Sequence, residues 1–153
     1  MAPKAVGEPL TGFMLDTNIF NRVIDGRFAR DELPIDAVVI VTHKQVEEVA
    51  STPDAYRERR IQLLLALMEW RPVLAPTAMV WDATRWGHAR WGDGKAYEAL
   101  KAALDQRNGG KPNNVADALI AETAMEGRHT LVTADDDLAM VAAAQGGKVL
   151  KVL

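Results

Sequence analysis

The stretch FMLDTN, residues 13–18, decides the fold that we expect for this chain. Its three apolar residues show no polar alternation, which is typical of a strand covered on both faces in a parallel sheet. An acid, Asp16, closes the strand, and a helix is predicted from Asn18 to Asp25 because Gly26 would end it. Asp16 is therefore expected at the carboxyl end of a strand, where open α/β sheets bind their ligands.

Outside this stretch, strands and helices continue to alternate along the chain. Apolar runs predict further strands over residues 36–41, 72–76, 130–133 and 148–152. Capping residues and helical spacing predict helices after Thr42 and after Thr52, and then over residues 77–91, 96–107, 115–126 and 136–144. Such alternation is typical of βαβ units with right-handed crossovers, so we expect an α/β fold with a mainly parallel sheet of four to five strands.

The length and composition fit one globular domain. The chain has 153 residues, of which 48% are hydrophobic, and this is enough for a single sizeable core. Pro3, Gly7 and Pro9 indicate a flexible N-terminal lead over residues 1–10. We expect a single domain over residues 11–153.

Charge and cysteine content exclude several classes of protein. A net charge of -3 argues against a protein that coats nucleic acid or membranes through bulk positive charge. The absence of cysteine excludes disulfides, thiolate metal sites and cysteine nucleophiles, and it suits a reducing compartment. No apolar run reaches the roughly 18 residues of a membrane span, and the N-terminus lacks the apolar core of a signal peptide. We therefore expect a cytoplasmic protein without membrane attachment.

Four acidic residues are predicted to meet at one end of this sheet. Asp16 and Asp135 follow predicted strands, whereas Glu48 and Asp117 lie near the starts of predicted helices. None has an obvious cationic partner next to it in sequence. The four carboxylates would repel one another unless a hard divalent cation such as Mg²⁺ or Mn²⁺ neutralised them. The sequence thus favours a metal-dependent enzyme.

Three of the four acids also have a simpler structural explanation. Asp16 could be a turn residue after a strand. Asp117 would be the third residue of a helix capped by Asn114, where a carboxylate complements the helix dipole. Residues 135–137 are three consecutive acids at the start of a helix that Thr133 could cap. These explanations account for single acids but not for the combined pattern.

Four motifs together resemble the PIN-domain ribonucleases, the family that includes the toxins of VapBC toxin-antitoxin pairs. They are MLDTN at residues 14–18, THKQVEEV at 42–49, NVADALIA at 114–121 and LVTADDDL at 131–138. The resemblance covers residues 12–153 in order and spacing, although residues 77–112 match no motif. It implies a PIN-like three-layer α/β/α fold and an endoribonuclease that needs Mg²⁺ or Mn²⁺ to cleave RNA.

The resemblance also assigns roles to individual residues. Asp16, Asp117 and Asp135 match the family's principal metal ligands. Glu48 matches its second acid, which completes the acidic pocket. Neighbouring helical residues point about 100° apart, so only one of Glu47 and Glu48 can face the site, and the match favours Glu48. The positions expected to support the site are Asn18, Thr133 and Asp137.

A section rich in tryptophan and arginine could contact RNA. Residues 81–91 interleave aromatic and cationic side chains, a mixture that can stack bases and hold phosphates. The tryptophans could equally fill the core or an interface between two copies, and we expect a homodimer. An antitoxin, where one exists, would offer a cationic side chain to the acidic pocket and an apolar helix to a groove. The candidates for a basic rim along the RNA backbone are Arg85, Arg90, Lys95, Lys101 and Lys111.

Two other functions compete with a ribonuclease. A phosphatase of the haloacid dehalogenase type would carry a second Asp two residues after Asp16, where this chain has Asn18. A PIN-like module that binds or regulates without catalysis is also consistent with the fold. We would expect such a module to have lost some of the four acids.

Overall fold

Five parallel strands form one sheet in the part of the chain that the structure describes. The structure is a computed structural model that describes residues 12–78, residues 94–153 and the backbone of residues 89 and 90. All neighbouring strands of the sheet are parallel, which confirms the predicted α/β class. In spatial order the strands are β3 (Val73–Leu74), β2 (Val38–Val41), β1 (Gly12–Leu15), β6 (Thr130–Thr133) and β7 (Lys148–Lys151).

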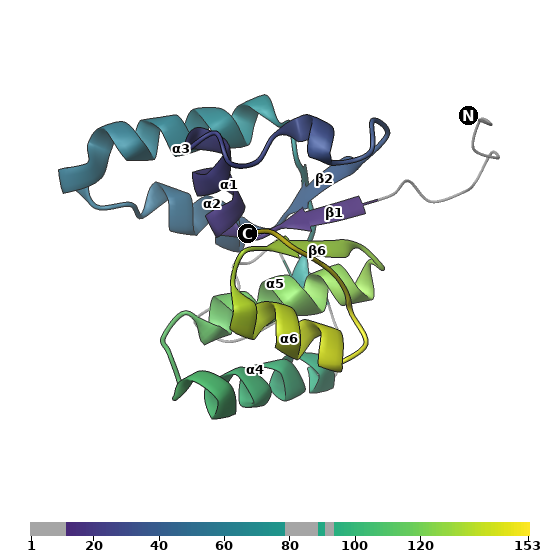
Figure 1. Ribbon diagram of the computed structural model, residues 1–153. Helices are drawn as coiled ribbons and strands as arrows, with labels where there is room; N and C mark the ends of the chain where they lie inside the picture. Colours follow the sequence, from purple (N-terminus) through teal and green to yellow (C-terminus); the bar gives the residue numbers. More distant parts are fainter. Residues whose placement is uncertain (1–11, 79–88, 91–93) are drawn as a thin grey trace.

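Helices cover both faces of this sheet (Figure 1). The first layer contains α1 (Thr17–Ile24), α2 (His43–Ala50) and α3 (Arg57–Glu69). The second layer contains α4 (Lys95–Asn108), α5 (Asn114–Glu126) and α6 (Asp136–Ala144). Two short 3₁₀ helices, Arg30–Glu32 and Asp54–Tyr56, lie in connections. Among the described residues, no helix is long and apolar enough to cross a membrane.

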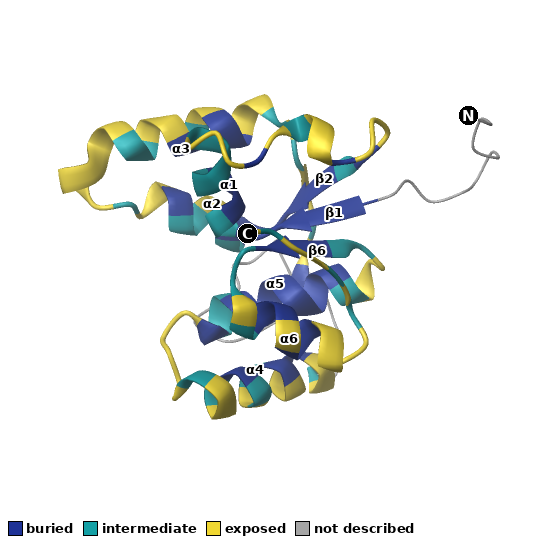
Figure 2. Cartoon of the chain, viewed as in Figure 1, coloured by how far each residue is buried: buried dark blue, intermediate teal, exposed yellow. Residues whose placement is uncertain are grey.

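Each face of the sheet has its own hydrophobic core. Phe13 and Leu15 of β1 pack into the core that α1, α2 and α3 cover, whereas Met14 packs into the core that α4, α5 and α6 cover. Successive residues of a strand point to opposite faces, so a strand buried on both sides needs an apolar residue at every position. Figure 2 shows that the central strands are buried and that the helices are exposed mainly on their outer sides.

The strand order reverses at β1, which lies in the middle of the sheet. β1 pairs with β2 on one side and with β6 on the other. The chain leaving β1 enters α1 on one face, and the chain leaving β6 enters α6 on the other face. Such a reversal is the position at which open α/β sheets bind ligands, in the crevice beyond the carboxyl ends of the strands.

Local capping signals agree with the helix starts. The hydroxyl of Thr42 accepts a hydrogen bond from the N–H of Lys44 at 3.1 Å, and Gln45 completes the capping box of α2. Asp16 caps α1, and Asp135 caps α6. The predicted helices confirmed to within one residue at each end are those over 96–107, 115–126 and 136–144.

Two expectations from the sequence are wrong. Helix is expected over residues 77–91, but Thr77–Ala78 (β4) and Ala89–Arg90 (β5) are strands that pair in parallel, while residues 79–88 and Trp91 lie outside the described part. Thr77 and Ala78 are buried, and this tertiary pairing overrides the helical spacing. Asn114 is expected to cap α5, but it is the first residue of that helix.

Candidate active site

Asp16 lies in a buried network where β1 meets α1, and it is 5% exposed. Its Oδ1 accepts a hydrogen bond from the N–H of Thr17 at 2.8 Å, and its Oδ2 accepts from the hydroxyl of Thr133 at 2.7 Å. The N–H of Asp16 donates to the carbonyl of Val132 at 2.9 Å. Strand β6 and the start of α1 therefore fix the orientation of this carboxylate.

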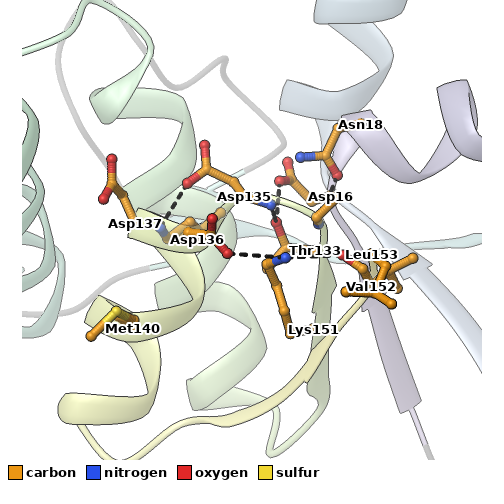
Figure 3. A network of polar contacts seen from close by, with 12 residues as sticks. Asp16, Asn18, Thr133, Asp135, Asp136, Asp137, Met140, Lys151, Val152 and Leu153 are labelled. Atoms are coloured by element: carbon orange, nitrogen blue, oxygen red, sulfur yellow. Dashed lines mark hydrogen bonds and ion pairs between the residues drawn. The ribbon is translucent and has the colours of Figure 1, made fainter.

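Thr133 links Asp16 to Asp135 (Figure 3). Its hydroxyl donates to Asp16, and the same oxygen accepts from the N–H of Asp135 at 3.0 Å. The Oδ1 of Asp135 then accepts a backbone N–H of α6 at 2.9 Å. Asn18 of α1 also contacts the segment between Thr133 and Asp135, because its Oδ1 accepts a hydrogen bond from the N–H of Ala134 at 3.2 Å. One hydroxyl thus contacts both a carboxylate and the backbone that carries a second one.

Asp117 lies in the second layer, on α5, and is 8% exposed. It is the fourth residue of that helix, and its N–H already makes a regular helical bond to the carbonyl of Asn113 at 3.0 Å. Its Oδ2 accepts from the side-chain amide of Asn113 at 3.2 Å. The carboxylate is thus bonded to a side chain of the preceding turn, beside the start of α5.

A polar network anchors the start of α5 to the end of α4. The Nδ2 of Asn114, a residue only 1% exposed, donates to Oδ1 of Asp105 and to Oδ1 of Asn108, both at 2.8 Å. Asn108 returns a hydrogen bond to Oδ1 of Asn114 at 2.9 Å. This network positions the part of α5 that carries Asp117, and it was missed in the sequence because Asn114 has the spacing of an ordinary cap.

Glu48 and Glu47 of α2 have different surroundings. Glu47 forms an ion pair with Lys44 at 3.2 Å, whereas Glu48 is electrostatically coupled to Asp16 and Asp117. Burial raises the pKa of Glu48, and the hydroxyl of Thr17 lowers it in part. Even so, neither Oε1 of Glu48 nor Oγ1 of Thr17, both buried, completes a hydrogen bond of regular geometry.

Burial and mutual repulsion raise the pKa values of two of the acids. Burial, with the charges of Glu48 and Asp135, raises the pKa of Asp16 to about 6, although the bonds from Thr133 and Thr17 oppose this. Burial, and then the charges of Asp16, Glu48 and Asp135, raises the pKa of Asp117 to about 8. The four acids therefore lie within electrostatic reach of one another, and without a cation the site cannot hold all four charges near neutral pH. The fourth charged group that affects Asp117 is the cation of Lys111, which lowers its pKa.

The donor atoms of the site suit Mg²⁺ or Mn²⁺. These ions take carboxylate oxygens as ligands. Among the described residues, the buried Oε1 of Glu48 completes no hydrogen bond of regular geometry, which is uncommon in proteins and would be explained by a bound cation. In the described residues, no three His, Cys, Asp or Glu side chains come close enough to hold an ion as they stand. The carboxylates would therefore have to draw together around a metal.

Of the remaining predicted residues, two form ion pairs, one is exposed, and two have side chains outside the described part. Asp137 pairs with Arg107 of α4 at 2.7 Å, and Lys101 pairs with Asp105 at 2.6 Å. Lys95 is exposed at the start of α4. The side chains of Arg85 and Arg90 belong to the part that is not described.

Gln45 is a second residue that sequence reasoning missed. The capping-box spacing from Thr42 identified it as part of a helix start. That signal contains no hint that the side chain is fully buried or that it reaches β1.

Comparisons with known proteins identify the fold. No family model matches the chain, and no curated protein matches it. Among solved structures, VapBC2 from Rickettsia felis bound to a DNA fragment from its promoter is similar, with a TM-score of 0.59 and 18% identity over 92% of this chain and 98% of that one. VapBC-5 from Mycobacterium tuberculosis, a member of the VapBC family of toxin-antitoxin systems, gives a TM-score of 0.52 and 18% identity over 93% and 99%. A domain of a functionally unknown protein from Methanocaldococcus jannaschii gives 0.56 and 19% over 94% and 91%.

These similarities extend over nearly the whole of each chain, and they define the class of fold. The parallel strand order, the helices on both faces and the neighbours from VapBC toxin-antitoxin systems agree with one another. The chain has a VapC-like PIN-domain fold. Identities of 18–19% establish that fold and leave the activity to be argued from the site.

Proposed function

We propose that this protein is a metal-dependent endoribonuclease that hydrolyses phosphodiester bonds in RNA, and that it acts as a VapC-like toxin. The observation that carries the proposal is the coupling of Asp16, Asp117 and two further acids at the switch point of the sheet. Among the described residues, the cations that act on these carboxylates, Lys111 on Asp117 and Lys44 on Glu48, offset the rise of their pKa values only in part. Mutual repulsion held in place in this way is typical of functional sites.

In the proposed site, some residues bind the metal and another transfers or orients a proton. Asp16, Asp117 and Asp135 would hold one or two ions of Mg²⁺ or Mn²⁺. A bound ion supplies charge neutralisation at the phosphate and lowers the pKa of water. Glu48 would accept a proton from the attacking water or orient it, because its buried Oε1 completes no hydrogen bond of regular geometry among the described residues. Lys111, exposed near Asp117, is placed to contact a phosphate at the rim.

The acidic site also indicates which molecules the protein would bind. An RNA strand would meet the acidic pocket with its negative phosphates, so its binding should depend on the metal. The VapBC neighbours support an antitoxin as the protein partner. Such a partner would block the pocket most directly by presenting a cationic side chain to the four acids.

One observation favours a second candidate, a PIN-like module that binds without catalysis. No three acids stand close enough together to hold an ion in the present arrangement of described residues. A phosphatase with an aspartate nucleophile has less support, because Asn18 occupies the place of its second Asp and is engaged with the N–H of Ala134.

A fluorescent RNA assay separates these functions. The protein is incubated with labelled RNA in Mg²⁺, in Mn²⁺ and in EDTA, and with a phosphomonoester in parallel. We expect internal cleavage of RNA with either ion and none in EDTA. Retention of RNA without cleavage would favour the binding module, and release of phosphate from the monoester alone would favour the phosphatase.

A further inference from the structure

We propose that Gln45 is the positioning residue of the acidic site, because its buried amide fixes α2, which carries Glu48, against the peptide group that carries Asp16. The inference rests on the proposed ribonuclease function and adds to it a residue that is not an acid. Gln45 touches neither metal nor substrate in this account, and it acts through the two acids that it holds in place.

The side chain of Gln45 is fully buried, with 0% exposure. Burying an amide costs free energy unless its donor and acceptor groups are paired. Its Oε1 accepts from the N–H of Thr42 at 2.8 Å and from the hydroxyl of Thr42 at 2.5 Å. Its Nε2 donates to the carbonyl of Leu15 at 3.0 Å and to Sδ of Met14 at 3.2 Å. Both ends of the amide are therefore engaged, which fixes its orientation.

An ordinary capping box explains only the first of these contacts. The box needs an oxygen that accepts from the backbone at the helix start, and an exposed Glu or Gln supplies it equally well. It requires neither full burial nor a donor. The amide nitrogen of Gln45 instead reaches a different element, the end of β1, at a separation of 30 residues in sequence.

The peptide group that Gln45 holds is the one that carries Asp16. The carbonyl of Leu15 and the N–H of Asp16 belong to the same planar unit. Its carbonyl accepts from Gln45 on α2, and its N–H donates to Val132 on β6 at 2.9 Å. The peptide is thereby held between the helix that carries Glu48 and the strand that leads to Asp135.

The position of Gln45 on its helix makes this clamp relevant to Glu48. Residues three apart lie on the same side of an α-helix. Attaching Gln45 to the end of β1 therefore limits how far Glu48 can move away from Asp16. The β1–β2 pairing ends at Met14 and Ile40, so this hydrogen bond extends the connection beyond the last paired strand residues.

The test compares two variants of the full chain. Gln45→Met keeps the length of the side chain and removes its hydrogen bonds. Leu63→Ala is the control for lost stability, because Leu63 is a buried core residue of α3, 4% exposed, and its loss removes packing from the core that Leu15 and Val49 share but no hydrogen bond of the site. Amide hydrogen exchange, Mn²⁺ affinity by calorimetry, and single-turnover RNA cleavage at saturating Mn²⁺ are measured well below both melting temperatures.

We expect Gln45→Met to speed exchange in α2 more than in α4, and to weaken Mn²⁺ binding and slow cleavage by about tenfold or more, as for other groups that orient metal ligands. The KM for RNA should stay near that of the wild type. Leu63→Ala should leave Mn²⁺ affinity and cleavage nearly unchanged. Gln45→Asn, a milder change for use if Gln45→Met does not fold, should give a smaller effect of the same kind.

Two kinds of failure are distinguishable. Wild-type exchange in α2 with wild-type Mn²⁺ affinity in Gln45→Met would overturn the positioning role, and so would a loss no greater than that of Leu63→Ala. Absence of RNA cleavage by the wild type would instead overturn the proposed function. The exchange data would then still decide whether Gln45 holds α2 against β1.

Discussion

Two single side chains, Asp16 and Asp117, hold protons that ordinary carboxyl groups release well below neutral pH. Their pKa values of about 6 and about 8 follow first from burial and then from the neighbouring acids. In the unfolded chain both groups would return to about 3.8. Folding without metal therefore binds protons, and the folded state should lose stability as the pH rises.

We predict the direction of this pH dependence for the metal-free protein. The contribution of the two groups is fully present below about pH 4 and is lost as the pH passes 6 for Asp16 and 8 for Asp117. Each group that must lose its proton changes the free energy of unfolding by up to roughly 1.4 kcal/mol per pH unit. Urea denaturation in EDTA between pH 5 and pH 8.5 measures the slope.

The control is the double variant Asp16→Asn, Asp117→Asn. It should show a flatter dependence than the wild type over the same range, and the difference between the two isolates these groups from His129, whose pKa burial lowers. A wild-type slope equal to that of the variant would contradict the raised pKa values.

A second prediction concerns the two neighbouring acids of α2. Glu48→Gln should reduce RNA cleavage much more than Glu47→Gln, because Glu48 is coupled to Asp16 and Asp117 while Glu47 pairs with Lys44. Parallel single-turnover rates of the two isosteric variants decide between them. A larger loss for Glu47→Gln would mean that the second acid of the site has been assigned to the wrong residue.

The connection between α4 and α5 shows how a whole element is positioned for the site. Asn114 joins α5 to Asp105 and Asn108 of α4, three residues before Asp117. Removing the buried amide of Asn114 takes a hydrogen bond from each of these partly buried partners, and the loss costs most where water cannot replace the bond.

We therefore predict that Asn114→Ala lowers the melting temperature by several degrees. The pKa of Asp105 should rise at the same time, because the bond from Asn114 is the largest cause of its lowering. Thermal melts and NMR titration measure the two effects. Gln106→Ala, an exposed change on α4 next to Asp105, is the control, and equal melts for both variants would show that the network does not anchor α5.

An element could be predicted from the sequence when the interactions that form it involve consecutive residues. β1 and α2 were predictable from an unbroken apolar run and a capping box, which are properties of consecutive residues. β4 was not, because Thr77 and Ala78 form a strand only by pairing with residues 89–90. The roles of Asn114 and Gln45 were hidden for the same reason, since their partners lie on other elements. The sheet topology was enough to predict that the four acids lie near one another. It did not predict that, in the described residues, no three of them come close enough to hold an ion.

For the protein as a whole, metal binding should couple to folding. Mn²⁺ or Mg²⁺ would bind the folded site and not the unfolded chain, so millimolar ion should raise the melting temperature. The variant Asp16→Asn, Asp117→Asn should lose this rise. The charge-matched control Asp31→Asn, Glu58→Gln removes two exposed acids and should retain it. A rise in the first variant equal to that of the wild type would place the ion elsewhere.

The most direct test of the account is single-turnover RNA cleavage by wild type and Asp16→Asn at saturating Mn²⁺, with a thermal melt of each preparation. Asp16→Asn removes a metal-binding charge while changing almost no volume, so the fold should persist and the metal-free protein should be no less stable. Loss of one principal ligand is expected to slow cleavage roughly a hundredfold or more. Cleavage near the wild-type rate by well-folded Asp16→Asn would contradict the metal-nuclease assignment.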